Sequence, residues 1–106
     1  MSDKIQAFIQ KLDASPSNRF HRYNLAQAYY EQGDYVNACD QFATCLKLAD
    51  DWMMASLGLG KCYLALEDFE RAKRNLSLTI DLAEKQGHDD PLEEAKSLLK
   101  QCSSSC

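Results

Sequence analysis

Apolar residues recur every three or four positions along most of the chain, which is the spacing of one face of an α-helix. The pattern is interrupted at Gly33, and Asp34 follows with a side-chain oxygen that can accept hydrogen bonds from the free N–H groups of a new helix. A second interruption comes before Asp68. The pattern therefore predicts an all-α chain built from helix, tight turn and helix.

The sequence also repeats itself with a period of 34 residues. Six identical pairs share this register, and they are Leu25 with Leu59, Tyr29 with Tyr63, Asp34 with Asp68, Ala38 with Ala72, Leu48 with Leu82 and Ala49 with Ala83. We expect one two-helix repeat at residues 19–52 and a second at residues 53–86. A two-helix unit cannot bury its apolar face alone, so the repeats are expected to stack and share one core.

One further helix is predicted at each end of the repeats. An apolar stripe from Ile5 to Leu12 predicts a helix at residues 3–14, ended by the turn at Pro16. This helix reads as the second half of a preceding unit. At the other end, Asp90 and Pro91 predict the start of a capping helix at residues 91–102, with residues 103–106 as a frayed tail. The whole chain, residues 1–106, is expected to be one domain.

The spacing resembles the tetratricopeptide repeat (TPR), which carries Leu-Gly and Tyr on its first helix and Ala and an aromatic residue on its second. The residues that carry the resemblance are Leu25-Ala26 with Tyr29, Leu59-Gly60 with Tyr63, Ala38 with Phe42, and Ala72 with Leu76. Arg22 and Ser56 depart from it, because the family usually has Trp there. The resemblance covers residues 19–86 and implies a right-handed superhelix of helical hairpins that binds other proteins.

In this family the first helices of successive repeats line a concave groove, and the resemblance implies the same surface here. The candidate peptide-binding or protein-binding residues are Phe20, Tyr23, Asn24, Gln27, Tyr30, Met54, Leu57, Lys61 and Leu64. Spacing alone places the five residues from the first repeat in one stripe, and exposed aromatic surface commonly marks a binding site. Alternatively, the C-terminal helix folds back into the groove and makes Tyr23, Tyr30, Met54 and Leu57 ordinary core.

Some members of the family grip a C-terminal carboxylate with paired Lys, Asn and Arg residues on this face. Asn24 fits one such place here, but Tyr23 and Gln27 stand where Lys and Asn would be expected. Lys61 is the one cation that the pattern places on the groove. We therefore expect an apolar or mixed peptide with one acidic contact to Lys61, rather than a chaperone tail.

Two function classes fit these observations. The first is a protein-interaction module or adaptor that binds a peptide or protein segment in the groove. The second is a self-assembling structural protein whose apolar faces meet in a homodimer. The net charge is −4, with twelve Lys and Arg scattered among sixteen Asp and Glu, so we expect no nucleic-acid partner. Without a secretory signal or an apolar run of about 20 residues, we expect no membrane partner and a cytoplasmic location.

Chemistry-bearing residues are sparse. The five cysteines contain no CxxC motif and are expected to stay reduced, four of them in or near helices, with Cys102 and Cys106 the more exposed pair. His21 and His88 lie far apart, and neither has a Cys or carboxylate at a ligand spacing. We therefore expect no catalytic residues, no metal and no cofactor, and a protein that is not an enzyme.

Overall fold

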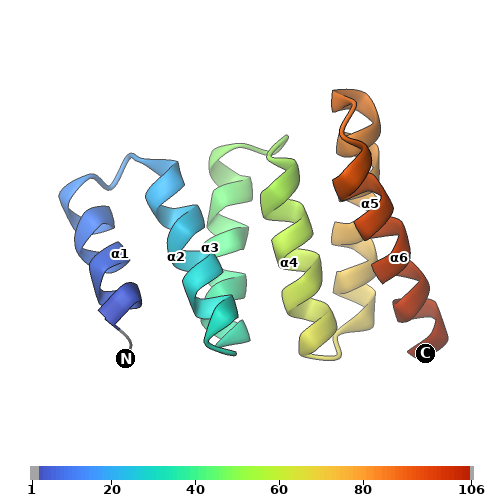
Figure 1. The fold of residues 1–106 in the computed structure, drawn as a ribbon, viewed down its shortest axis with the longest axis horizontal. Coiled ribbons are helices and arrows are strands. Elements are labelled where there is room, and N and C mark those ends of the chain that lie inside the picture. The colour runs from blue at the N-terminus through green and yellow to red at the C-terminus, as the bar shows by residue number, and fades with distance from the viewer. Residues whose placement is uncertain (1–2, 106) are drawn as a thin grey trace.

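The chain folds into a row of antiparallel helices (Figure 1). A computed structural model describes residues 3–105, and the side chains of residues 3–102. Over that range it contains six helices and no strand, and they are α1 (Asp3–Ala14), α2 (Arg19–Glu31), α3 (Tyr35–Leu48), α4 (Met53–Ala65), α5 (Phe69–Gln86) and α6 (Asp89–Ser105). The predicted all-α architecture of helical hairpins is confirmed.

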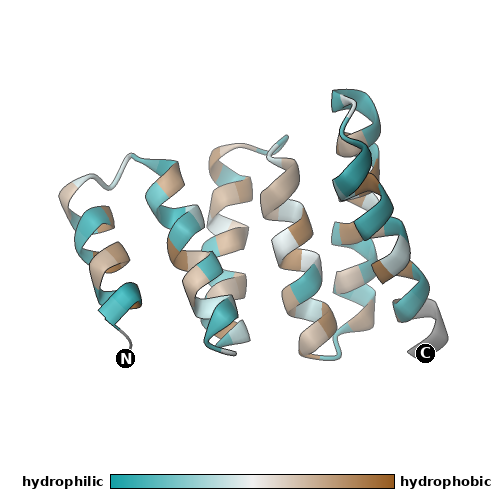
Figure 2. Cartoon of the chain, viewed as in Figure 1, coloured by the Kyte–Doolittle hydropathy of each residue, from teal (hydrophilic) through white to brown (hydrophobic). Residues whose placement is uncertain are grey.

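The helices form two layers. In Figure 1, α2, α4 and α6 lie toward the viewer and α3 and α5 lie behind them, while α1 closes the N-terminal end against α2. Helix α4 packs against helices on both sides and behind it, and it is apolar for most of its length (Figure 2). Lys61 is its only charged residue. The front layer is therefore continuous from one repeat to the next.

The core lies between the layers and depends on small residues. A Cβ atom added at Gly58 would lie 2.5 Å from Cζ of Phe42, and one at Gly60 would lie 2.8 Å from Cδ2 of Leu76. Both of those larger side chains are fully buried. The glycines thus let α4 approach α3 and α5 more closely than any larger residue would allow.

The turn inside each repeat is built in the same way. Asp34 accepts a hydrogen bond from the backbone N–H of Asn37 at 3.4 Å, and Asp68 accepts one from that of Arg71 at 3.3 Å. The residue before each aspartate has a positive φ, 80° at Gly33 and 61° at Glu67. These caps satisfy N–H groups that have no partner inside the helix.

Helix α6 is longer than predicted at both ends. It begins at Asp89, and the backbone N–H of Leu92 donates to the carbonyl of His88 at 3.3 Å. Pro91 fits into this first turn because N–H groups there need no partner inside the helix. The helix continues to Ser105, so residues 103–105 are helical and not a frayed tail. Position 106 of that predicted tail lies outside the described residues.

The expected exposure of Cys102 is wrong. Its side chain is fully buried and packs with Leu57, Ala72, Leu76 and Ala95 between α4, α5 and α6. The spacing of Ala95 and Cys102 puts both on the inner face of α6, and this burial holds the last turns of the helix against the stack. Its predicted companion, Cys106, lies outside the described residues.

Among residues 3–105, no helix combines the length and the apolar character needed to cross a bilayer. Each helix carries charged residues, and even the most apolar, α4, is only 13 residues long.

Candidate binding groove

The front layer carries a pocket between α2, α4 and α6. We call the surface formed by α2, α4 and α6 the groove, and we call this pocket the groove pocket. The pocket has a volume of about 250 Å³ and is lined by Tyr30, Lys61, Leu64, Ala65, Leu98 and Gln101. It brings together three predicted residues, Tyr30, Lys61 and Leu64, from two repeats. Leu98 and Gln101 were missed because they belong to α6, outside the repeats.

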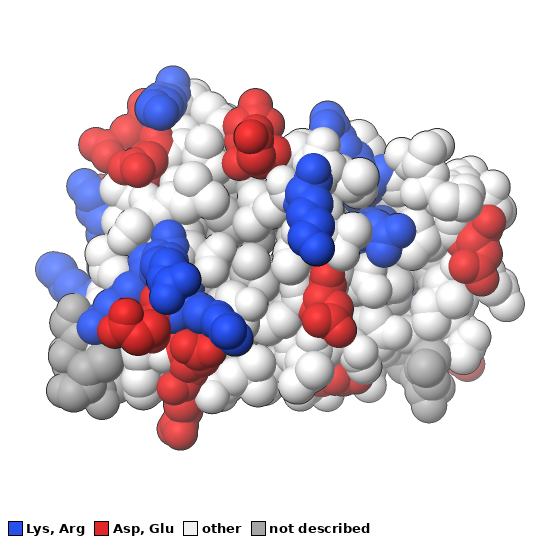
Figure 3. Space-filling model, turned by 180° about the vertical axis from the view of Figure 1, so that it is seen from behind, with Lys and Arg blue, Asp and Glu red and all other residues white. Residues whose placement is uncertain are grey.

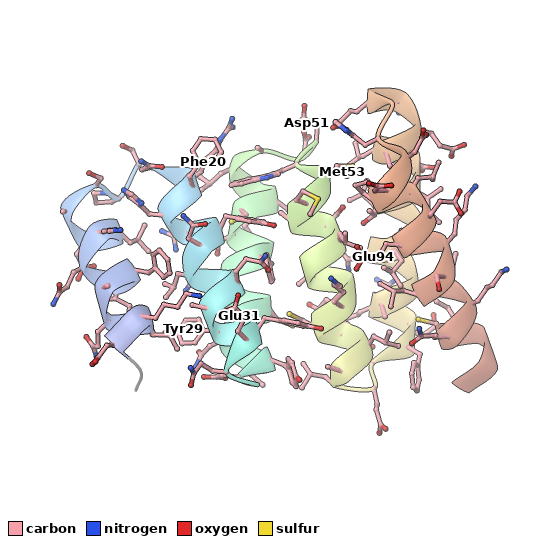
Figure 4. The ribbon with its side chains drawn as sticks, in the orientation of Figure 1. Phe20, Tyr29, Glu31, Asp51, Met53 and Glu94 are labelled. Carbon is pink, nitrogen blue, oxygen red and sulfur yellow. The ribbon has the colours of Figure 1, made fainter. Side chains whose placement is uncertain are left out.

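Lys61 is held by an ion pair across the groove. Its Nζ lies 2.7 Å from Oε2 of Glu94, and the two side chains are 34% and 44% exposed. In Figure 4, Glu94 extends from α6 toward α4. The acidic contact expected from a partner is thus made by the protein itself.

The other predicted groove residues differ in exposure. Leu57 does not line the open groove, because α5 and α6 cover it and leave it 2% exposed. Met54, one turn earlier in α4, is 38% exposed. Asn24 and Gln27 are exposed on α2, and Tyr23 is half-buried. Helix α6 therefore covers part of the predicted surface and leaves the part around α2 accessible.

Tyr30 is positioned by a second tyrosine. Its ring meets that of Tyr35 edge to face, with 5.3 Å between the centroids. Burial raises the pKa of Tyr30 above its ordinary value, and nearby Lys61 offsets this only in part. The hydroxyl therefore stays protonated at neutral pH and can donate or accept a hydrogen bond.

An aromatic cluster forms where the groove meets the α3–α4 loop, near the Phe20 and Asp51 labels in Figure 4. Trp52 stacks on Tyr23 at 5.2 Å and meets Phe20 edge to face at 5.6 Å. The Arg19 guanidinium lies 5.5 Å from the centroids of both the Phe20 and Trp52 rings. A second pocket, the rim pocket, lies beside this cluster. It has a volume of about 320 Å³ and is lined by Arg19, Phe20, Ala49, Asp51, Trp52 and Gln86.

Trp52 was missed by the sequence reasoning. Its signal was available, because it is the only tryptophan in the chain and stands directly before the first helix of the second repeat. Such a residue can reach back to the stripe formed by Phe20 and Tyr23 on the first helix of the first repeat.

Comparison with known proteins finds a family match within the first repeat. Residues 22–52 match the family profile described as tetratricopeptide repeat. The fold agrees over nearly the whole chain: the first TPR of Spaghetti (RPAP3), bound to the HSP90 peptide SRMEEVD, gives a TM-score of 0.83. It is 22% identical, with 95% of this chain and 75% of that chain covered. One segment thus matches the tetratricopeptide repeat, and the chain as a whole has the fold of a TPR domain.

Other TPR domains show the same likeness. The TPR2B domain of yeast Sti1, in its complex with pHsp70, has a TM-score of 0.89 and 13% identity, over 96% of this chain and 82% of that chain. Anaphase-promoting complex subunit 3 of Dictyostelium discoideum is 25% identical over 88 residues. The match covers 83% of this chain, which spans only 9% of the length of that relative.

The two departures at usual Trp positions are accommodated in the structure. Arg22, at a usual Trp position, donates from Nη1 to Oε1 of Gln41 at 2.9 Å. Ser56, at the other, lies 2.7 Å from Oγ1 of Thr79, and both hydroxyls are buried. In each repeat, a hydrogen-bonded polar pair between two helices thus stands where the family usually has a Trp side chain.

The two histidines are not among the residues that line the groove pocket. His21 contacts the side chain of Asn18 at 3.3 Å, and His88 lies exposed in the α5–α6 turn. Within the described residues, no three His, Cys, Asp or Glu side chains gather as metal ligands. On the opposite face, Lys and Arg lie among Asp and Glu (Figure 3).

Proposed function

We propose that this chain is a protein-interaction module that holds an extended peptide or protein segment in the groove formed by α2, α4 and α6. The observation that carries the proposal is the groove pocket, which joins side chains from both repeats and the capping helix. Two proteins of the same fold are seen with such partners, RPAP3 with an HSP90 peptide and Sti1 with pHsp70.

The chemistry of the pocket suits one side chain of a bound segment. Tyr30, Leu64 and Leu98 offer apolar surface, while Gln101 and exposed Gln27 can hydrogen-bond the segment's backbone. A volume of about 250 Å³ is smaller than the usual site for a drug-sized ligand. A single apolar anchor residue is therefore a better fit than a whole metabolite.

The same proposal places the module in the cytoplasm and assigns it no catalytic role. Cys39, Cys45 and Cys62 are free, buried thiols, in keeping with a reducing compartment.

The test is selection of a displayed random peptide library on the immobilised protein. Ala65→Arg places a long side chain in the pocket from an exposed position, and Ala7→Arg makes the same change at an exposed position on α1. We expect peptides to be enriched on the wild type and on Ala7→Arg, and enrichment to be lost on Ala65→Arg. Equal enrichment on all three would show that the groove pocket is not the binding site.

Light scattering after size exclusion separates this proposal from the self-assembling alternative. A monomer leaves the groove available to another protein. A dimer that Ala65→Arg dissociates would instead show that a second copy occupies the groove.

A further inference from the structure

The charges around the groove pocket are already matched within the chain. Lys61 is the only cation among the six lining residues, and its Nζ forms an ion pair with Oε2 of Glu94 at 2.7 Å. Glu94 lies on the same face of α6 as Leu98 and Gln101, because these positions are four and seven residues apart. The carboxylate thus stands at the pocket and not on the outer side of α6.

Two neighbouring cations are engaged by other residues of the chain. On the α1 side of α2, Nζ of Lys4 pairs with Oε2 of Glu31 at 2.8 Å. At the rim, the Arg19 guanidinium lies over the Phe20 and Trp52 rings. Lys61 is therefore the cation that lines the groove pocket, and a carboxylate of this chain already neutralises it.

An acidic segment would meet two obstacles at this position. Its carboxylate would have to displace Glu94 from Lys61, and separating this partly exposed ion pair has a modest cost. The displaced Glu94 carboxylate would then remain beside the incoming negative charge, and like charges at short range repel. An uncharged segment meets neither obstacle.

We propose that Glu94 sets the specificity of the groove pocket by holding Lys61, so that the groove admits an extended segment with an uncharged apolar anchor and rejects acidic segments. This inference rests on the proposed function, because it concerns the segment that the same pocket binds. It differs from the sequence-based expectation of an acidic contact to Lys61, because Glu94 already makes that contact.

The experiment compares Glu94→Gln with Glu93→Gln. The control removes one negative charge from the adjacent exposed position of α6, so both variants have the same net charge. The probes are the random peptide library and the acidic peptide SRMEEVD. We expect the wild type and Glu93→Gln to select few Asp and Glu residues. Glu94→Gln should select them more often and bind SRMEEVD about twofold to fivefold more tightly than wild type does. Raising the salt concentration should shrink this difference.

Each other outcome has one meaning. If wild type and Glu94→Gln select acidic residues equally often, Glu94 does not set the specificity, although the groove stands as long as Ala65→Arg abolishes enrichment. If Glu93→Gln acts as strongly as Glu94→Gln, net charge is responsible and the inference is overturned. If Ala65→Arg selects the same peptides as wild type, the proposed function fails and the inference fails with it. Thermal melts of each variant establish that the fold is intact.

Discussion

At the scale of single residues, the glycines of α4 decide how closely the helices pack. Gly58 faces the ring of Phe42, and Gly60 faces the side chain of Leu76. Glycine weakens a helix interior by about 1 kcal/mol relative to alanine. At these two positions that cost is offset by contact between helices, so the local preference and the packing oppose each other.

Gly58→Ala tests which effect is larger. The new Cβ would lie 2.5 Å from Cζ of a fully buried ring, so the ring or the helix must move. We expect the free energy of unfolding to fall by about 1–3 kcal/mol, more than the gain in helix propensity. Urea denaturation measures the change. Adding Phe42→Leu should recover part of the loss from Gly58→Ala, and an unchanged midpoint for Gly58→Ala alone would contradict the close approach.

The buried hydroxyl pair makes a second prediction at this scale. Ser56 Oγ also lies 2.7 Å from the carbonyl of Met53, and Thr79 Oγ1 lies 2.8 Å from that of Asn75. Either hydroxyl therefore keeps a backbone acceptor when its partner is removed. We expect Ser56→Ala or Thr79→Val to cost about 0.5–1.5 kcal/mol each, and the double variant to cost clearly less than the sum. Strict additivity in a double-mutant cycle would mean that the hydroxyls do not interact.

At the scale of elements, the two repeats form the same turn with different residues at the position of positive φ. The positive-φ position is Gly33 in the first repeat and Glu67 in the second, and these positions correspond in the 34-residue register. A left-handed backbone is strained for residues with a side chain. The second turn therefore carries a strain that the first avoids.

Substitutions at these two positions should change the free energy of unfolding in opposite directions. We expect Glu67→Gly to raise the free energy of unfolding by about 0.5–1 kcal/mol, because the strain disappears without loss of a described contact. Gly33→Ala should lower it by about 1 kcal/mol for the converse reason. Thermal and urea unfolding of both variants provide the measurement. A destabilised Glu67→Gly would show that the glutamate side chain makes a needed interaction.

The sequence was sufficient to predict the helical hairpins, because helical period, turn glycine and capping aspartate are local signals. The groove was predicted only in part. Leu57 has the spacing of a groove residue, yet α6 covers it, and the approach of a helix outside the repeats has no signal in the 34-residue register. The pairing of Lys61 with Glu94 depends on the same approach. The helices and turns of each repeat were thus predictable from local signals, whereas the contacts of Trp52 and of the capping helix were not.

At the scale of the whole molecule, the apolar surface is unevenly distributed. The large hydrophobic side chains that stay exposed are Phe20, Val36, Leu48, Met54 and Leu66. Among the described residues, none of these belongs to α1 or α6, so the end helices face water with polar surface. Phe20 and Met54 lie on α2 and α4, which form the groove, and Val36 and Leu48 lie on α3. The stack is therefore covered by polar surface at both ends, and its exposed apolar side chains lie on the repeats, two of them on the helices of the groove.

The buried thiols make the stability of the folded chain depend on pH. Cys45 and Cys62 are fully buried, and Cys39 nearly so. Burial raises the pKa of Cys45 to about 11, and it also raises the pKa values of Cys39 and Cys62. In the unfolded chain a thiol has a pKa of about 8.5. The folded state thus favours the neutral thiol. Its contribution to stability is complete below the unfolded pKa and is lost as pH rises through the folded one.

We therefore expect the free energy of unfolding to be level near pH 7.5 and to fall between pH 8.5 and pH 10.5, by about 2 kcal/mol for the Cys45 thiol alone. Urea denaturation in a phosphine reductant, repeated across this range, measures the slope. Cys45→Ala leaves a small cavity, which lowers stability at every pH, but it removes one thiol whose ionisation opposes folding, so its slope should be shallower than that of wild type. Parallel pH profiles for the two proteins would mean that the Cys45 thiol ionises as readily in the folded chain as in the unfolded one, which a fully buried position between α3 and its neighbours does not allow.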